Sequence, residues 1–171
     1  MLGDLTYLVD SLIAVRDQAN ARVEELDGKG SLAGRLEEFA DGAEELRGSI
    51  VSTADTGWIS GDEKLREKLG NLFGGVVNYD GRPTQSQLDR TQVLAGQLES
   101  AQSSFSSLTA SRDLTQLNSQ LEGKSLEPIT VISREEWDAE QEKKGGGASG
   151  VSAKKLSQEM AHRVWWPLGG F

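Results

Sequence analysis

The sequence predicts an all-α fold, an elongated antiparallel helical bundle with a short extended segment and a flexible C-terminal tail. Apolar residues recur at spacings of three and four over several long stretches, which is the period of an amphipathic helix. Ser or Thr precedes Glu or Gln by three residues at several points, the spacing of a helix N-terminal capping box. Hydrophobic residues make up 36% of the chain and aromatics 6%, which favours a thin core of Leu, Ala and Val.

The first two predicted helices form an antiparallel pair. The first carries an apolar stripe over residues 5–26, and the second carries one over residues 32–53. Residues 27–31 separate them and contain two glycines, which suit a left-handed helix C-terminus. Two long helices joined by so short a turn are expected to pack antiparallel.

A second helical hairpin is predicted over residues 60–121, and we expect the rest of the chain to be organised around it. Ser60 with Glu63, and Thr84 with Gln87, have capping-box spacing, and residues 78–83 have the composition of a turn. The second helix of this hairpin carries a stripe that should face the core, widened by Leu94, Ala101 and Leu108. The stripe comprises Leu88, Thr91, Ala95, Leu98, Gln102, Phe105 and Thr109.

Three shorter elements follow. Asp113 with Gln116 is expected to open a helix over residues 114–121. Residues 126–132 should be extended, because Pro128 disfavours helix and β-branched residues follow it. We expect this segment to lie along the bundle without forming a sheet. A capping box at Ser133 and Glu136 predicts a last, charged helix ending near Lys144.

The domain organisation predicted from these patterns is a helical bundle over residues 1–144, a Gly-rich linker over 145–150 and an aromatic tail over 151–171. The tail holds three basic residues and one acidic residue. Its large apolar side chains are the candidate partner-binding residues, because tryptophan is favoured at protein interfaces and at membrane–water boundaries. These residues are Trp165, Trp166, Leu168 and Phe171. Three roles stay open: capping the bundle, docking into a partner protein, and contact with a membrane interface.

Composition argues against several classes of function. A net charge of −9 disfavours nucleic acid as a partner, and the lack of cysteine excludes thiolate metal sites. No catalytic, cofactor-binding or metal-ligating residue is predicted. The carboxylates Glu37, Glu38, Glu44 and Glu45 are interpreted as a solvated helix face, and His162 has no partner at metal-ligand spacing. Asp4 and Asp10 interrupt the N-terminal apolar residues, so no signal peptide is predicted there.

Three stretches resemble the C-terminal helical region of bacterial sortilin-like BNR-repeat secreted proteins. They are LVDSLIAVRDQ at residues 8–18, KLREKLGNLFGGVVNYDGRPTQSQ at 64–87, and DLTQLNSQLEGKSLEPI at 113–129. The resemblance covers about residues 5–138. It implies a periplasmic or secreted protein and a non-catalytic role for this region. The chain has no Asp-box repeat of the propeller, so no glycosidase activity is carried over, and the residues from Gly145 onward fall outside the likeness.

The function predicted from these observations is that of a non-catalytic structural or accessory subunit, which binds a protein partner through its helical faces and its Trp-rich tail. The partner is expected in a larger membrane-associated or secreted assembly. One alternative is a helical appendage, or fragment, of a secreted propeller protein of the glycosyl-hydrolase type. Another is a peripheral subunit of a membrane protein complex, anchored by its tail.

Overall fold

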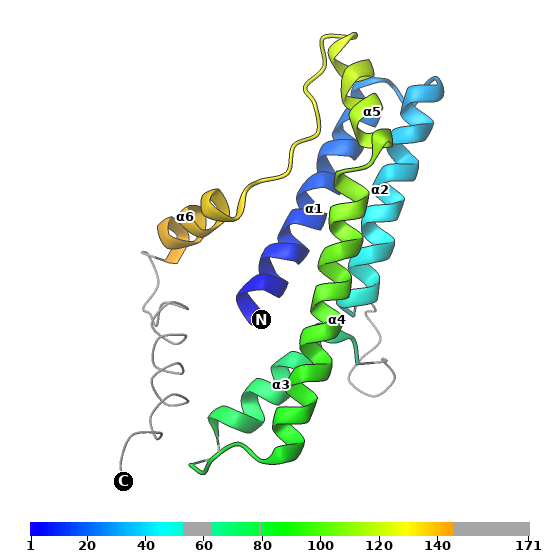
Figure 1. The fold of residues 1–171 in the computed structure, drawn as a ribbon. Helices are drawn as coiled ribbons and strands as arrows, with labels where there is room; N and C mark the ends of the chain where they lie inside the picture. The colour runs from blue at the N-terminus through cyan, green and yellow to red at the C-terminus, as the bar shows by residue number, and fades with distance from the viewer. Residues whose placement is uncertain (53–62, 79, 146–171) are drawn as a thin grey trace. The chain divides into compact units, whose positions relative to one another are not determined.

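The fold is all-helical, as predicted. The computed structural model describes residues 1–52, 63–78 and 80–145, and these residues form six helices and no strand. Contacts between residues divide the chain into two compact units, Met1–Val131 and Ile132–Phe171. The first unit contains helices α1 to α5, and the described part of the second contains α6 (Figure 1).

The first unit is built on a hairpin of two long helices, α1 (Leu2–Glu25) and α2 (Ser31–Ile50), which lie side by side along most of their length (Figure 1). The predicted stripes form its core. The buried apolar residues are Leu5, Leu8, Leu12, Val15 and Ala19 of α1, and Leu32, Ala33, Leu36, Phe39, Ala40, Ala43 and Ile50 of α2. Fully burying one leucine side chain stabilises a fold by about 1.5–3 kcal/mol, so this seam is a main source of stability.

The turn between α1 and α2 is a Schellman motif, in which a left-handed residue follows the helix. The backbone N–H of Gly28 donates to the carbonyl of Val23 at 2.9 Å, and that of Asp27 donates to Glu24 at 2.9 Å. The first left-handed residue is Asp27, with φ of 54°, and Gly28 follows with φ of 65°. The sequence pattern favoured glycine for this position, but aspartate is one of the few other residues that tolerate it.

The second hairpin consists of α3 (Leu65–Val77) and α4 (Gln85–Thr109). Thr84 caps α4 as predicted: its hydroxyl accepts the Gln87 N–H, and the Gln87 side chain accepts the Thr84 N–H at 2.8 Å. The predicted start of α3 was wrong, because Glu63 precedes the helix. Lys64 is the N-cap instead, and its N–H donates to the Glu67 carboxylate at 3.1 Å. Ser60 lies outside the described residues.

The buried face of α4 is rotated from the predicted one. Leu94, Leu98 and Phe105 are buried, with Ala101 and Leu108 partly buried beside them, whereas Ala95 and Gln102 are exposed. The predicted stripe and the buried stripe repeat with the same helical period. The stripe with the larger apolar side chains is the one that packs inward. Leu88 is 47% exposed because the first turns of α4 lie beside the short helix α3, beyond the α1–α2 hairpin (Figure 1).

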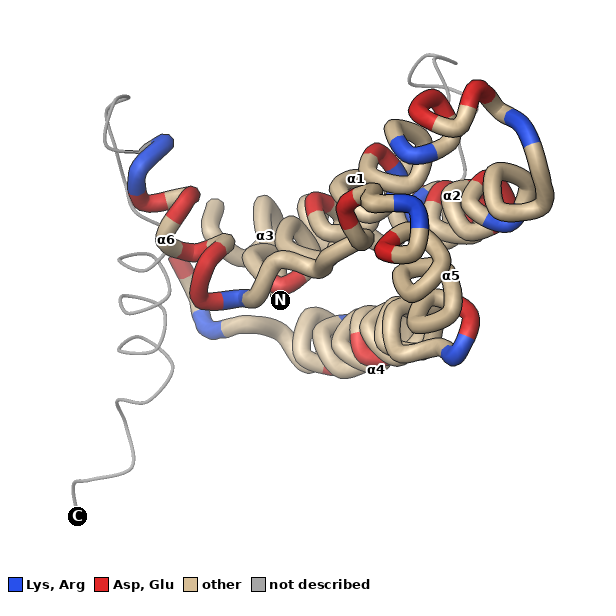
Figure 2. Tube along the Cα trace, turned by 90° about the horizontal axis from the view of Figure 1, so that it is seen from above, with Lys and Arg blue, Asp and Glu red and all other residues tan. Residues whose placement is uncertain are grey.

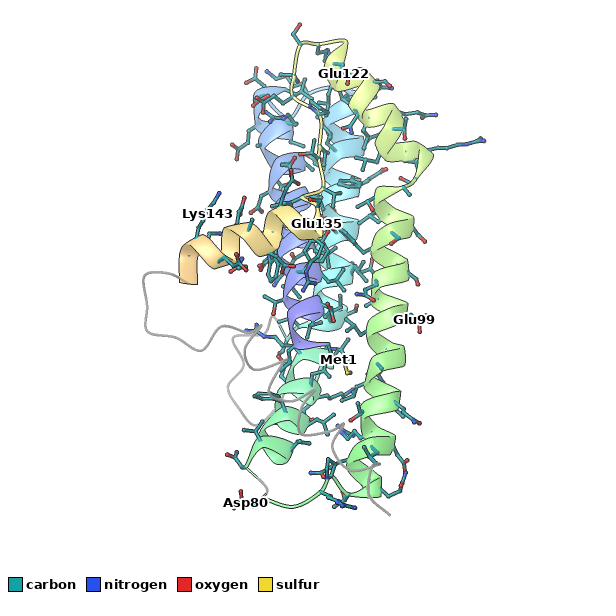
Figure 3. The ribbon with its side chains drawn as sticks, turned by 60° about the vertical axis from the view of Figure 1, so that its left-hand side comes forward. Met1, Asp80, Glu99, Glu122, Glu135 and Lys143 are labelled. Atoms are coloured by element: carbon teal, nitrogen blue, oxygen red, sulfur yellow. The ribbon has the colours of Figure 1, made fainter. Side chains whose placement is uncertain are left out.

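Helix α5 (Arg112–Glu122) begins two residues earlier than predicted. Its N-cap is Ser111, whose hydroxyl accepts the Leu114 N–H at 3.1 Å, and Asp113 lies in the first turn. Leu114, Leu117 and Leu121 are buried. Glu122 and Asp80, which marks the α3–α4 turn, lie at opposite ends of this unit in Figure 3, and Met1 lies between them.

After α5 the chain is extended and runs back along the bundle, as predicted. Residues 126–131, which we call the strap, contain no helix or strand, and Ile129 is buried in the core. The strap begins at a second Schellman motif, in which the Leu126 N–H donates to the Leu121 carbonyl at 3.0 Å. Ser125, with φ of 61°, holds the left-handed position there.

The described part of the second unit is α6 (Arg134–Gly145). The Ser133–Glu136 capping box is confirmed: the Ser133 N–H donates to the Glu136 carboxylate at 3.0 Å, and the Glu136 N–H donates to the Ser133 hydroxyl. The Ser133 backbone N–H, and after it the Ser133 hydroxyl, donate to the Glu136 carboxylate and lower the pKa of that group. Within the described residues, no helix combines the length and apolar character needed to cross a bilayer.

Candidate protein-interaction site

The strap is attached to α1 and α5 of the first unit by hydrogen bonds from side chains to its backbone. Asn118 of α5 holds it through both ends of its side-chain amide. The amide nitrogen donates to the Ile129 carbonyl at 3.0 Å, and the amide oxygen accepts the Ile129 N–H at 2.8 Å. The backbone of this buried residue is therefore fully hydrogen-bonded without a neighbouring strand.

Gln18 of α1 makes the same pair of bonds with the next residue of the strap. Its amide nitrogen donates to the Thr130 carbonyl at 2.9 Å, and its oxygen accepts the Thr130 N–H at 2.9 Å. Successive residues of an extended chain present their backbone groups to opposite sides. One amide from α5 and one from α1 therefore hold the strap from its two sides, much as neighbouring strands would.

An open groove lies between α2 and α4. Its upper part, the end near α5, has a volume of about 730 Å³. Apolar side chains from three helices line this part: Phe39 and Leu46 of α2, Leu108 of α4 and Leu117 of α5. Gly42, Ser104 and Ser107 also line it. These small residues leave the space between the two helices unfilled by side chains.

A second hollow of about 690 Å³ continues the groove toward α3. Leu46, Ser49 and Ser104 line both hollows, so the two form one continuous groove along α2 and α4. Ile50 and Ala101 add apolar surface in this lower part. From residue 91 to its end, α4 has one charged residue, Glu99, which does not line the groove; Figure 2 shows how sparse charge is along this helix.

The serine hydroxyls along the groove already have acceptors within their own helices. Ser104 donates to the Ser100 carbonyl at 3.1 Å, Ser107 to Ser103 at 2.9 Å, and Ser49 to Leu46 at 2.7 Å. A serine bonded in this way presents little unsatisfied polar surface. These three hydroxyls are therefore satisfied within the helices, and the apolar side chains of the groove lie among serines, Gln97 and charged residues.

Charged side chains line the groove unevenly. The upper part has three acidic residues, Glu38, Glu45 and Asp113, and one basic residue, Arg35. The lower part has two basic residues, Lys64 and Lys68, and one acidic residue, Glu63. The groove is thus acidic at the end near α5 and basic at the end near α3.

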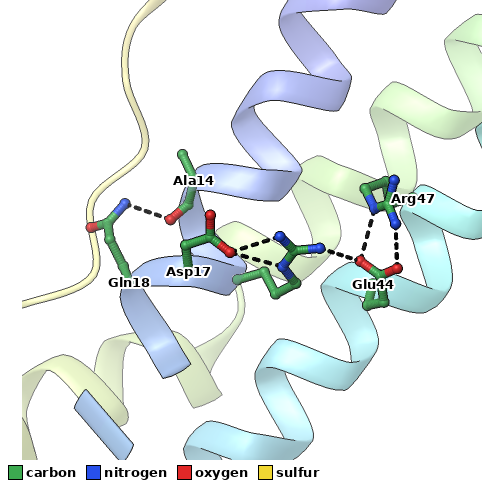
Figure 4. Close-up of polar contacts among 6 residues, drawn as sticks. Ala14, Asp17, Gln18, Glu44 and Arg47 are labelled. Carbon is green, nitrogen blue, oxygen red and sulfur yellow. Dashed lines mark hydrogen bonds and ion pairs between the residues drawn. The ribbon is translucent and has the colours of Figure 1, made fainter. Parts of the chain in front are cut away.

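The strongest electrostatic feature of the first unit lies between α1 and α2. Glu44 accepts two hydrogen bonds from Arg47, and Arg16 donates to the same carboxylate at 2.7 Å (Figure 4). The hydrogen bonds from Arg47 are the main cause that lowers the pKa of Glu44 from 4.5 to about 2; burial opposes them, and the bond from Arg16 adds to the lowering. Arg16 is also bonded to Asp17, so each charge in the network has a partner. This network links α1 to α2, and each of its carboxylates and guanidinium groups is already paired with an opposite charge.

The residues predicted to bind a partner, Trp165, Trp166, Leu168 and Phe171, lie outside the described residues, as does His162. Of the carboxylates interpreted as a solvated face, Glu37, Glu38 and Glu45 are exposed and Glu44 is half-buried. Among the described residues, no three His, Asp or Glu side chains are grouped as metal ligands.

The sequence reasoning missed the α2–α4 groove, although its pattern is visible in the chain. Small residues recur on α4 at Ser100, Ser104 and Ser107, a helical spacing of four and three. Such a stripe lies beside the apolar stripe and marks a helix face that approaches other chains closely.

No family model matches the chain, and the comparisons with curated proteins and with solved structures return no match.

Proposed function

We propose that the protein is a non-catalytic accessory or scaffold subunit that binds another protein through its helical faces and its C-terminal tail. The observation that carries the proposal is the open groove between α2 and α4, lined by Phe39, Leu46 and Leu108. Grooves with apolar floors between helices are common docking sites for segments of other proteins.

The arrangement of charge supports binding in preference to chemistry. The most perturbed carboxylate, Glu44, is bonded to two arginines that hold it ionised, so it serves as an anchor between helices. The acidic residues of the groove stand on its exposed edges, where they steer an oppositely charged surface toward it.

The proposal is tested by isolating the native chain from its source cells and measuring the mass of what elutes by size-exclusion chromatography with light scattering. A complex of defined stoichiometry with a second protein is the expected result. A chain that elutes as a monomer from native extract, with nothing bound at stoichiometric amount, would overturn the proposal.

The alternative, a helical appendage of a secreted propeller protein, is favoured by one specific observation. Two of the stretches that resemble that family, residues 8–18 and 113–129, contain Gln18, Asn118 and Ile129, which attach the strap to the bundle. The likeness therefore includes residues with a defined structural role. Finding propeller repeats in the same precursor chain, by mass spectrometry of the secreted protein, decides for this alternative.

A further inference from the structure

The α2–α4 groove has the length for one short helix. On α2 its lining runs from Arg35 to Ile50, which at 1.5 Å per residue corresponds to roughly 22 Å, or about four helical turns. Small residues on both sides, such as Gly42 and Ser104, allow the backbone of a third element to approach closely. A helix placed there would pack against α2 and α4 together.

The hydrogen-bonding character of the groove distinguishes a helix from an extended peptide. The strap shows what this protein provides for an extended chain: the amides of Gln18 and Asn118, each making two backbone bonds. In the α2–α4 groove the hydroxyls of Ser49, Ser104 and Ser107 are already bonded to carbonyls of their own helices, and no pair of amides like Gln18 and Asn118 lines it among the described residues. A helix satisfies its own backbone and needs no such donors, whereas an extended segment would bury unpaired backbone groups at about 1–3 kcal/mol each.

The uneven charge of the groove sets the direction of that helix. Acidic side chains near a helix N-terminus and basic side chains near its C-terminus are favoured by the helix dipole. A helix with acidic residues in its first turn and basic residues in its last turn complements the charges of the groove in one direction. Its first turn then lies beside Lys64 and Lys68, and its last turn lies beside Glu38 and Glu45.

We propose that the α2–α4 groove binds a single amphipathic helix of a partner protein, about four turns long, with an acidic first turn and a basic last turn, running antiparallel to α2. This rests on the proposed function and specifies the partner's chemistry. A second copy of this chain is a poor occupant, because two molecules each carrying a net charge of −9 repel one another.

The test uses the full-length chain and two synthetic helical peptides of about 16 residues, hydrocarbon-stapled so that their helicity is equal. The forward peptide has Glu in its first turn, Leu on one face and Lys or Arg in its last turn; the mirrored peptide exchanges the charges. Fluorescence anisotropy gives the dissociation constant of each. We expect the forward peptide to bind at least tenfold more tightly than the mirrored one. Equal affinities, or no binding of the forward peptide at millimolar concentration, would overturn the proposal.

A blocking variant locates the peptide on the protein. Ser104→Trp places a large side chain where both hollows meet, and Ser103→Trp places the same side chain at an exposed neighbouring position that does not line the groove. Ser104→Trp should weaken the forward peptide tenfold or more, and Ser103→Trp should change its affinity less than twofold. Circular dichroism and the melting temperature check that both variants fold. Equal effects of the two variants would place the peptide elsewhere and refute the proposal.

A charge reversal tests the direction of binding without adding bulk. Glu38→Lys with Glu45→Lys should weaken the forward peptide and strengthen the mirrored one. Glu37→Lys with Glu99→Lys makes the same change in net charge at exposed positions outside the groove, and should affect both peptides alike. If both double variants have the same effect, general attraction explains the binding and the groove does not select a direction.

The remaining outcomes separate this inference from the proposed function. If Trp165→Ala with Trp166→Ala raises the affinity for the forward peptide, or if Ser104→Trp dissociates a homo-oligomer, the chain itself occupies the groove and the inference is wrong. If the native partner co-elutes equally with Ser104→Trp and Ser103→Trp, the proposed function stands and the groove is not its site. If Ser104→Trp loses the native partner and Ser103→Trp keeps it, the result supports both the proposed function and the groove as its site.

Discussion

Replacing Asn118 by alanine removes the side chain that holds the buried residue of the strap. Asn118 donates to the Ile129 carbonyl and accepts the Ile129 N–H, and the Ile129 side chain is 3% exposed in the core. The substitution leaves both backbone groups of Ile129 without partners. We therefore expect Asn118→Ala to destabilise the fold and to loosen the strap locally.

The loss of folding free energy in Asn118→Ala depends on how well water can replace the hydrogen bonds that Asn118 makes to the Ile129 backbone. An unpaired buried donor or acceptor costs about 1–3 kcal/mol. Opening of the strap admits some water to Ile129, so a total loss of about 2 kcal/mol is expected. Gln18→Ala provides the matched comparison, because it removes the same two bonds from Thr130, which is exposed and can bond to solvent at once. Its expected cost is below about 1 kcal/mol.

Urea unfolding gives the two stabilities, and amide hydrogen exchange reads the strap directly. A loss of about 2 kcal/mol corresponds to roughly 30-fold faster exchange at the Ile129 amide in Asn118→Ala. The Thr130 amide should respond more strongly to Gln18→Ala. The reasoning is refuted if the wild-type Ile129 amide exchanges at the rate of an unfolded chain, or if Asn118→Ala costs no more than Gln18→Ala.

Four further predictions concern individual residues. Because the folded-state pKa of Glu44, about 2, lies below its ordinary value of 4.5, its stabilising contribution is fully present above about pH 5 and is lost as the pH falls toward 2. Glu44→Gln should thus lower the free energy of unfolding by about 1 kcal/mol at pH 7, a value that allows for a side chain 40% exposed to solvent. At pH 2 the same substitution should cost almost nothing. Urea unfolding at the two pH values measures both costs, and a cost independent of pH would contradict this. The Ser11 hydroxyl is buried without a hydrogen-bond partner, so Ser11→Ala should stabilise by about 1 kcal/mol, and a lower melting temperature would argue against the assignment. Ser125→Gly should raise the melting temperature by relieving a left-handed backbone conformation that costs about 1 kcal/mol, unless the residue has another conformation in solution. Thr84→Ala should cost about 1 kcal/mol in chemical unfolding through loss of the α4 cap, and a neutral result would mean that this end of α4 is frayed.

Periodicity predicted the helices well because it reflects which face of a helix is buried. The stripe from Leu5 to Ala19 and the stripe from Leu32 to Ile50 are the core of the α1–α2 hairpin. Capping boxes were reliable where the hydroxyl residue stood directly before the first turn, as at Thr84 and Ser133. The extended strap followed from Pro128 and the β-branched residues after it.

Errors arose where two local patterns of similar strength competed. On α4, two stripes share one period, and only tertiary packing places Leu94 and Phe105 inside and Ala95 outside. At α5, both Ser111 and Asp113 are good N-caps, and the position of Leu114 in the core decides for Ser111. The Asp27 and Ser125 turns could not be foreseen from a preference for glycine, because the hydrogen bonds of each Schellman motif hold a less favoured residue there.

The candidate site was only partly accessible to sequence reasoning. A role in protein binding was predicted, but it was assigned to helix faces in general and to the tail. The groove is lined by residues of α2, α3, α4 and α5, among them Gly42 and several serines, and only the packing of these helices brings those residues together. The amides of Gln18 and Asn118 bond to residues far along the chain or across a turn, so no local pattern reveals them.

Deuterium uptake along the chain, compared between the native complex and the purified protein alone, tests the central claim most directly. The account predicts slower uptake in the complex along α2 and α4, on the segments that contain Leu46, Ser49 and Ser104, with α1 little changed. Uptake that is unchanged in both helices while the partner remains bound would contradict it.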